Sequence, residues 1–98
     1  MLKKQYSKDK KTCKVTFSVP AEVNAQTVHL CGDFTKWEKA PKQMKRYADG
    51  SFKVSVELKP RKRYQFRYLL DGQRWENDWQ ADEYVPNQFG SEDSVLKT

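Results

Sequence analysis

The side chains of this sequence most suited to binding a ligand are aromatic, and they fall in expected loops or at strand ends. An aromatic ring offers a flat, rigid surface on which the C–H face of a sugar can stack, while Arg, Lys, Asn or Asp side chains bind the hydroxyl groups. Small β-domains usually present binding residues at such positions. The aromatic residues concerned are Trp37, Trp75, Trp79, Tyr84 and Phe89. The same rings could instead cap the hydrophobic core, and the sequence leaves both interpretations open.

The acidic residues are the second group that could do chemistry. Glycoside hydrolysis requires two carboxylates held at a fixed separation across a cleft. We interpret the acidic cluster as turn-forming and solvated charge, because it lies in and after a predicted turn; it comprises Asp71, Glu76, Asp78, Asp82 and Glu83. His29 is the only histidine and lacks a nucleophile motif or further metal ligands at suitable spacing, so we expect a strand surface residue. With no glycine-rich phosphate loop, we expect neither an enzyme nor a cofactor or metal site.

Alternating apolar residues predict the strands that would position these side chains. The clearest run is residues 64–70, where Tyr64, Phe66, Tyr68 and Leu70 share one face. Asp71-Gly72 follows, a residue pair favoured in tight hairpin turns. Further strands are expected at 12–19, 27–31, 43–47, 51–58 and 94–97, with an ordered loop at 34–41 and a long polar loop at 80–92. Short strands separated by Gly and Pro turns predict an all-β antiparallel β-sandwich of about seven strands.

Length and composition predict one domain with a modest core. The chain has 98 residues, of which 37% are hydrophobic and 13% aromatic. This suits a single two-layer core better than a large catalytic cleft. We expect residues 1–11 to form a basic, loose N-terminal tail and residues 12–98 to form the sandwich. Two cysteines, no membrane-length apolar segment and no signal-peptide pattern favour a cytoplasmic protein without membrane contact.

The positive charge of the chain raises nucleic acid as a candidate partner. The net charge is +6, and much of the excess lies in the first 14 residues and in residues 59–63. Aromatic side chains beside Lys and Arg can also stack on nucleic-acid bases. Because the basic residues lie mainly in the terminus and one turn, we interpret them as solvated surface and rank nucleic acid last.

Several segments, taken together and in order, resemble a known family. The matching segments are Val-His-Leu-Cys-Gly-Asp-Phe-Thr-Lys-Trp at 28–37, Met44 with the hairpin at 49–52, Tyr-Gln-Phe-Arg-Tyr-Leu-Leu-Asp-Gly at 64–72 with Trp75 and Asp78 after it, and Gly90 ahead of Asp93-Ser94-Val95. Over about residues 14–97 they are similar to family 48 carbohydrate-binding modules, also called isoamylase N-terminal or early-set domains. The resemblance implies an immunoglobulin-like β-sandwich of the early-set type.

The resemblance also implies non-catalytic binding of α-1,4-linked glucan such as glycogen or starch. In the similar glycogen-binding domain of AMP-activated kinase β subunits, two tryptophans stack on the sugar, a lysine and an asparagine bind hydroxyls, and an apolar loop residue threads the glucan. Carried over in that order, the carbohydrate-binding residues would be Trp37 and Trp75, Arg67, Asp93 and Phe89. Asp93 in place of asparagine removes an amide donor from that position.

A second function is open beside glucan binding. Family members that precede a hydrolase barrel often bind no sugar and serve as packing partners. The alternative is therefore a protein-interaction or structural module that has kept the fold, has lost the sugar site and works in trans with a glycogen-metabolising enzyme. The replacement of the family's asparagines by Thr35 and Asp93 is the sequence feature that keeps this alternative open.

Overall fold

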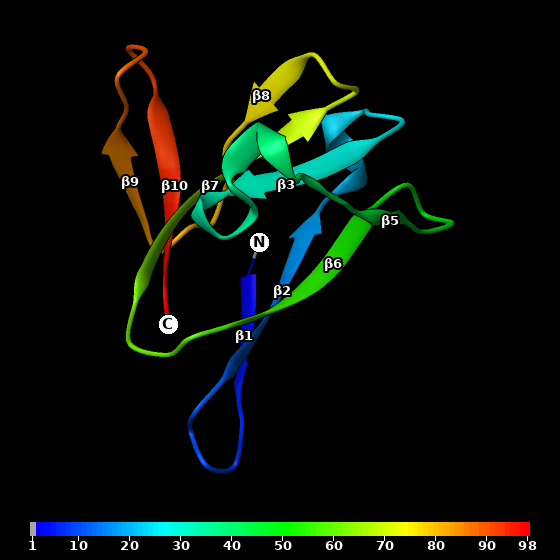
Figure 1. Ribbon diagram of the computed structural model, residues 1–98. Coiled ribbons are helices and arrows are strands. Elements are labelled where there is room, and N and C mark those ends of the chain that lie inside the picture. Colours follow the sequence, from blue (N-terminus) through cyan, green and yellow to red (C-terminus); the bar gives the residue numbers. More distant parts are fainter. Residues whose placement is uncertain (1) are drawn as a thin grey trace.

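The computed structural model, described here for residues 2–98, consists of two antiparallel β-sheets packed face to face (Figure 1). The first sheet has the order β1-β2-β6-β5, and the second has the order β4-β3-β7-β10-β9, with β8 paired to β7. The strands are β1 (Leu2–Tyr6), β2 (Cys13–Val19), β3 (Val28–Gly32), β4 (Lys42–Gln43), β5 (Lys45–Arg46), β6 (Phe52–Leu58), β7 (Arg63–Leu70), β8 (Arg74–Glu76), β9 (Glu83–Pro86) and β10 (Glu92–Lys97). The predicted all-β sandwich is confirmed, with ten strands in place of about seven.

The core lies between the sheets and follows the alternation of the sequence. In β2 every second residue is buried, and in β7 Phe66, Tyr68 and Leu70 are buried while Gln65 and Arg67 face outward. Phe66 packs edge-on against Phe17, with ring centroids 5.2 Å apart. Such aromatic pairs add to the stabilisation from burial of apolar area. The outward side chains of β7 are therefore carried on a rigid support.

The expectation of a loose terminus at residues 1–11 is wrong for residues 2–6, while Met1 lies outside the described residues. β1 pairs with β2 along its whole length, from Leu2 opposite Phe17 to Tyr6 opposite Cys13. Lys4 also forms an ion pair with Asp82, and the Tyr6 hydroxyl donates a hydrogen bond to the carbonyl of Thr98. Only Leu2 of this strand packs against the core, so its apolar pattern is too weak to predict a strand.

Two other segments differ from the sequence-based expectation. The strand expected at 43–47 is split, because the chain crosses from the second sheet (β4) to the first (β5) at Met44, whose side chain is buried in the core. The polar loop expected at 80–92 contains β9, which pairs with β10. The expected ordered loop at 34–41 holds the 3₁₀ helices η2 (Asp33–Thr35) and η3 (Trp37–Lys39), and η1 (Ala21–Val23) precedes β3.

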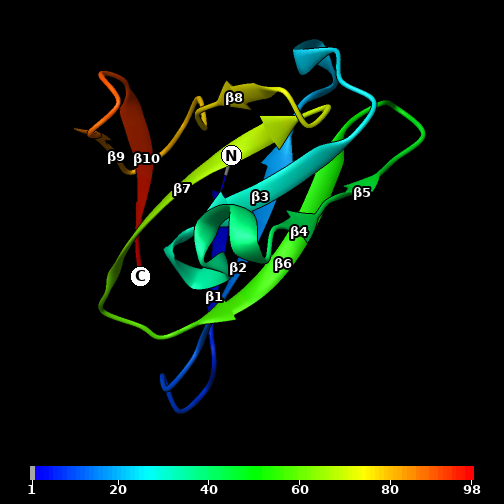
Figure 2. The same cartoon turned by 45° about the horizontal axis from the view of Figure 1, so that its top comes forward.

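The 3₁₀ helices η2 and η3, the strand β8 and the β9–β10 hairpin surround one part of the second sheet. Figure 2 shows η2 and η3 coiled beside the end of β3, with β8 along β7 and the β9–β10 hairpin at the far edge. β10 pairs with the first half of β7 and β8 with the second half, so both flank Arg67 on the same side of β7. Loops from three separate chain segments can therefore contribute to one site.

Candidate functional site

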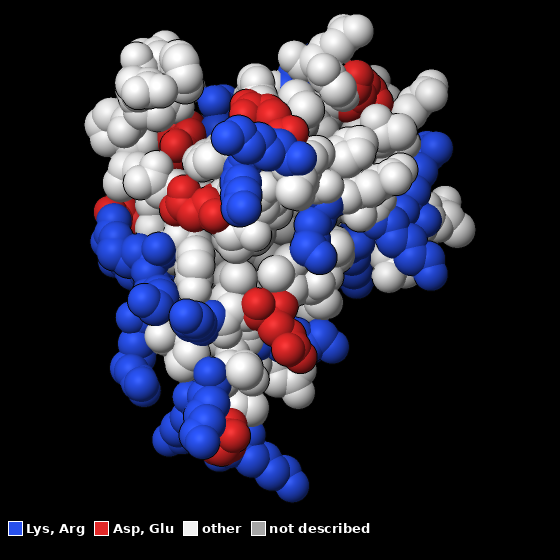
Figure 3. Space-filling model, in the orientation of Figure 1, with Lys and Arg blue, Asp and Glu red and all other residues white. Residues whose placement is uncertain are grey.

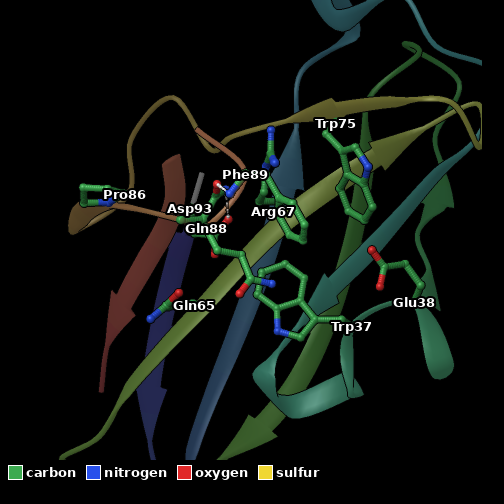
Figure 4. Close-up of a pocket in the computed structure, with 10 residues that line it drawn as sticks. Trp37, Glu38, Gln65, Arg67, Trp75, Pro86, Gln88, Phe89 and Asp93 are labelled. Atoms are coloured by element: carbon green, nitrogen blue, oxygen red, sulfur yellow. Dashed lines mark hydrogen bonds between the residues drawn. The ribbon is translucent and has the colours of Figure 1, made fainter. Parts of the chain in front are cut away.

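A groove of about 750 Å³ lies on the outer face of the second sheet, bounded by η3, β8 and the β9–β10 hairpin (Figure 4). The structure brings together all five residues that the family resemblance implied. The residues are Trp37, Arg67, Trp75, Phe89 and Asp93, and all of them line the groove. Five further residues complete the lining: Glu38, Gln65, Pro86, Asn87 and Gln88. In Figure 4, Trp75 and Glu38 lie on one side of the groove, with Pro86 and Asp93 on the other.

The Gly-Asp-Phe segment positions the first wall of the groove. A Cβ atom at Gly32 would lie 2.7 Å from the carbonyl oxygen of Gln65 and 2.9 Å from Cβ of Phe66. Contacts this short are not tolerated in packed proteins, so the close approach of β3 and β7 requires glycine. The Phe34 side chain then packs against the hydrophobic core, with its ring centroid 5.6 Å from that of Phe17. The chain is thereby fixed on both sides of Asp33.

Trp37 is held in a backbone conformation that non-glycine residues rarely adopt. Both Lys36 and Trp37 have positive φ angles, of 54° and 56°. Such residues persist where the surroundings over-determine them, and they cluster at functional sites. Here the buried Thr35 hydroxyl accepts a 2.9 Å hydrogen bond from the Gly32 N–H and lies 3.1 Å from the carbonyl oxygens of Gly32 and Trp37. Thr35, which departs from the family pattern, thus closes the loop.

Asp33 fixes the edge of the Trp37 indole. One carboxylate oxygen of Asp33 accepts a 3.2 Å hydrogen bond from Nε1 of Trp37, and the other accepts a 2.8 Å bond from the backbone N–H of Gln65. The carboxylate therefore ties the indole to β7 through its polar edge. Trp37 is only partly buried and is not part of the core cluster, so ring surface remains for contact with a ligand.

The second wall is formed by Trp75, which follows the Asp71-Gly72 turn. Both residues have positive φ angles, of 53° and 70°, and lie in the three-residue loop between Leu70 and Arg74, which pair across the β7–β8 hairpin. Asp71 is a turn former as expected, since its side chain accepts hydrogen bonds from the N–H groups of Gln26 and Thr27, and these bonds lower its pKa. Trp75 then pairs with Leu69 on β7. It is only partly buried, like Trp37.

Arg67 connects the floor of the groove to Trp75. Its guanidinium carbon lies 5.5 Å from the centroid of the Trp75 ring, within the range of a cation–π contact. Nε of Arg67 is a buried donor with no hydrogen-bond partner among residues 2–98. An arginine held flat by stacking presents its remaining N–H groups in a fixed direction. Arg67 therefore supplies oriented donors at the floor of the groove.

The interpretation of Asp78 as solvated charge is wrong. Asp78 is completely buried, and its carboxylate accepts a 2.6 Å hydrogen bond from the hydroxyl of Tyr68 on β7. Burial, together with the charge of Asp78, raises the pKa of this tyrosine well above its usual value. The N–H of Asp78 donates to the hydroxyl of Ser94, which bonds in turn to Asn77. This network joins β7, the segment that follows β8, and β10 beneath the groove.

The β9–β10 loop closes the groove and is organised by Asn87. Oδ1 of Asn87 accepts hydrogen bonds from the N–H groups of Phe89 (2.9 Å) and Ser91 (3.1 Å), while Nδ2 donates to Asp93 (3.0 Å). The Phe89 side chain projects from this loop and is 81% exposed, whereas Asp93 is only 7% exposed. The aromatic surface of Phe89 is therefore available for contact with a ligand at the rim of the groove.

Some lining residues could have been anticipated from the sequence and others could not. Gln65 shares the outer face of a period-two strand with Arg67, and Glu38 follows Trp37 directly. Asn87 carries no such signal, because its role depends on the hairpin that forms around it. Two other aromatic candidates lie outside the groove lining: Trp79, 51% exposed, bonds to Glu76, and the Tyr84 hydroxyl donates to the Asp78 carbonyl.

The charges of the groove differ from those of the whole chain. The groove lining holds two carboxylates, Glu38 and Asp93, and one guanidinium, Arg67. One cluster of basic residues lies elsewhere, around a notch between the β1–β2 and β6–β7 turns that we call the basic end (Figure 3). It consists of Lys10, Lys11, Lys59, Arg61 and Lys62, with Asp9 and Pro60 among them. The structure thus joins two basic clusters that are far apart in the sequence.

Residues 2–98 contain no group of His, Cys, Asp and Glu arranged to hold a metal ion. Both cysteines are free and buried, and burial raises the pKa of the Cys31 thiol to about 11. Among the same residues no helix is long and apolar enough to cross a membrane. The chemistry available in the groove is therefore that of aromatic faces, amide and guanidinium donors and carboxylate acceptors.

Comparison with known protein families shows to which family this β-sandwich belongs. The family model for carbohydrate-binding module 48, the isoamylase N-terminal domain, matches residues 4–85. The chain belongs to this family of carbohydrate-binding modules, whose members are binding domains and not catalytic ones. The resemblance noted in the sequence is therefore confirmed. A search of curated proteins gave no significant match.

Among solved structures, the enterobactin esterase of Shigella flexneri, crystallised in the presence of 2,3-dihydroxy-N-benzoyl-serine, has a similar fold. The TM-score is 0.76 at 14% sequence identity, and the match covers 99% of this chain. The chain spans about a third of the esterase, since the match covers 32% of that protein. At this identity the likeness concerns the fold alone.

Proposed function

We propose that this module binds an α-1,4-linked glucan of the glycogen or starch type by aromatic stacking in the groove. The observation that carries the proposal is the convergence of Trp37, Trp75 and Phe89, from three separate segments, around the oriented guanidinium of Arg67. The two indoles offer stacking surfaces, and Phe89 offers an apolar contact at the exposed rim. Asp93 and Arg67 lie between them as acceptor and donor for hydroxyl groups.

The electrostatics of the groove favour a neutral ligand. A polyanion would approach two carboxylates and one guanidinium, whereas sugar hydroxyls can hydrogen-bond to both kinds of group. Nucleic-acid recognition by stacking normally combines aromatic platforms with a positively charged groove that follows the backbone. In this chain the aromatic groove and the basic end are separate surfaces. This separation supports sugar over nucleic acid as the ligand.

The proposal is tested by affinity electrophoresis in gels containing glycogen, amylopectin or a non-glucan polysaccharide, followed by titration with a short α-1,4-glucan. Trp37→Ala and Trp75→Ala should each cost about 1–3 kcal/mol of binding free energy, by analogy with base stacking. Because weak binding leaves little margin, either loss should bring the short glucan close to the limit of detection. Trp79→Ala is the matched control, since it removes an exposed indole outside the groove.

The melting temperatures of the same variants separate a binding platform from a core cap. Loss of a fully buried Trp would cost about 3–5 kcal/mol of stability, but both groove tryptophans are partly exposed, so we expect smaller changes. Reduced glucan binding with a nearly unchanged melting temperature supports the platform. The proposal is wrong if the unmodified protein is not retarded by either glucan, or if both Trp variants bind as it does.

The second candidate is an interaction module that works in trans with a glycogen-metabolising enzyme. The observation that favours it is the exposed indole of Trp79, which lies outside the groove and has no role in the glucan site proposed above. Pull-down of branching or debranching enzymes by the unmodified protein and by Trp79→Ala separates the two functions. Capture that depends on Trp79, without retardation by glucan, favours the interaction module.

A further inference from the structure

We infer that Asn87 and Asp93 act as a pair that recognises two neighbouring free hydroxyl groups of a neutral sugar, and that Asn87 supplies the amide donor missing at position 93. This inference rests on the proposed function and specifies the chemistry of the same groove. Asn87 is not one of the residues that the family resemblance implied. Its placement follows from the β9–β10 hairpin alone.

The orientation of the Asn87 amide is determined by its contacts. Its oxygen accepts from two backbone N–H groups, of Phe89 and Ser91, so the nitrogen must face Asp93, to which it donates at 3.0 Å. An amide nitrogen carries two hydrogens. One is used by Asp93, and the other has no partner among residues 2–98, while the side chain lines the groove. A donor is therefore available to a ligand.

Asp93 provides the complementary acceptor. It is more than nine-tenths buried and lines the groove, and Oδ1 accepts the bond from Asn87. Within residues 2–98, Oδ2 has neither a hydrogen bond nor an ion pair; Arg67 stacks on Trp75 and forms no salt bridge with Asp93. An ionised carboxylate is an acceptor only. The free oxygen suits a ligand that donates.

The pair thus presents one donor and one acceptor side by side. Two adjacent hydroxyl groups match this arrangement, because one can donate to Oδ2 of Asp93 while its neighbour accepts from Nδ2 of Asn87. A phosphate or carboxylate substituent on either hydroxyl would bring a second negative charge to the largely buried Asp93, which is strongly unfavourable. The predicted ligand therefore carries unsubstituted neighbouring hydroxyls, and anionic derivatives are rejected.

The test uses variants that change the pair and keep the loop. Asn87→Asp retains an oxygen that can accept from the Phe89 and Ser91 N–H groups but loses the donor. Asp93→Asn retains an oxygen that can accept from Asn87 but loses the negative charge. Ser91→Ala, in the same loop but outside the groove lining, is the control, since the loop uses the backbone of Ser91. The probes are maltoheptaose and a phosphorylated maltoheptaose, titrated by calorimetry, with the melting temperature of each variant measured alongside.

We expect Asn87→Asp to weaken maltoheptaose binding about tenfold or more, which corresponds to about 1.4 kcal/mol. Its melting temperature should also fall, because the new carboxylate lies beside Asp93, to which Asn87 donates at 3.0 Å. Asp93→Asn should retain most of the affinity for maltoheptaose and lose most of the discrimination against the phosphorylated form. A purely structural pair would leave that discrimination unchanged. The inference is overturned if Asn87→Asp binds as the unmodified protein does, or if Asp93→Asn discriminates equally well.

The outcomes also separate this inference from the proposed function. An unmodified protein that binds neither maltoheptaose nor any other neutral oligosaccharide in a panel of linkages overturns both. A protein that binds maltoheptaose through Trp37 and Trp75, with both pair variants unaltered, overturns only the pair. Should Asn87→Asp unfold, the discrimination ratio of Asp93→Asn decides by itself.

Discussion

The groove and the basic end are two polar surfaces of this module, and they are built in different ways. The groove rests on buried hydrogen bonds, a glycine that permits close strand approach and two successive residues with positive φ, the second of which carries the first indole. The basic end consists of exposed cations at two turns, and none of its five cations forms an ion pair within residues 2–98. The side chains of the groove are therefore held by buried contacts, whereas the cations of the basic end are not.

This difference shows that the net charge of a chain is a poor guide to its ligand. The charge of +6 arises from residues of the basic end and others outside the groove, while carboxylates outnumber cations in the groove lining. Overall charge governs solubility and long-range attraction, but a binding site is defined by local groups. Changes at the basic end should therefore leave ligand binding in the groove unaltered, and changes in the groove should leave the basic end unaltered.

The largest contrast is expected in the response to salt. Glucan is uncharged, so binding in the groove should change less than about twofold between 50 and 200 mM salt, whereas any duplex DNA held by about five cations should lose on the order of 10²–10³-fold in affinity. Calorimetric titration with maltoheptaose and filter binding with DNA over this range give the dependence of each affinity on salt concentration. A glucan affinity that falls with salt in parallel with DNA retention would break the distinction.

The separation of the two surfaces also predicts the effect of reversing charges at the basic end. The triple variant Lys10→Glu/Lys59→Glu/Arg61→Glu should abolish DNA retention and leave glucan binding intact.

The next effect in size concerns the support of the groove. Asp78→Ala removes the buried acceptor of the Tyr68 hydroxyl and of the Gln80 N–H, which should cost about 3 kcal/mol of stability. Chemical denaturation measures this free energy of unfolding, and glucan titration of the remaining folded protein should show weakened binding. Glu57→Ala, which removes an exposed carboxylate from β6 in the first sheet, is the control and should stay within about 0.5 kcal/mol. Equal stability of the two variants would show that the network beneath the groove is dispensable.

Asp78 also shows where prediction from the sequence reaches its limit. The strands with strict alternation, such as β2 and β7, and the five groove residues implied by the resemblance were accessible from the sequence. The burial of Asp78 was not, because its partners Tyr68 and Ser94 are 10 and 16 residues away and meet it only after the strands pair. β1 was missed for the same reason, since its contacts with Asp82 and Thr98 lie at the other end of the chain.

A smaller effect is expected on acidification, through Glu83 on β9. The bidentate hydrogen bonds from Arg63, together with Lys97, lower the pKa of Glu83 to about 2. This is below the usual value of about 4.3 for an unfolded chain. The stabilisation is therefore present above about pH 4.5 and is lost as the pH falls towards 2. Arg63 directly follows the residues of the basic end, so this contact connects the two regions.

Melting curves of the unmodified protein and of Glu83→Gln between pH 5 and pH 2.5 measure this contribution. The variant lacks the titrating carboxylate, so its melting temperature should start lower and fall less than that of the unmodified protein. Other carboxylates, such as Asp71, also have lowered pKa values and destabilise both proteins equally on acidification. Parallel curves for the two proteins would show that the ion pairs of Glu83 contribute nothing measurable.

The smallest expected effect lies within the groove itself, at Arg67. Its contacts with neutral hydroxyls contribute about 0.5–1.5 kcal/mol, so Arg67→Ala should weaken glucan binding less than tenfold and less than either Trp variant.

Arg67→Lys separates the charge of this residue from its stacking, because it keeps the charge at the floor of the groove but not the planar group that stacks on Trp75. If the charge alone matters, the lysine variant should bind as the unmodified protein does. If stacking orients the donors, it should resemble Arg67→Ala, and Trp75 fluorescence should change in both variants because the cation–π contact is lost. Full glucan affinity in Arg67→Ala would exclude this side chain from the site and leave the two indoles, Phe89 and the Asn87–Asp93 pair as the groups that hold the sugar.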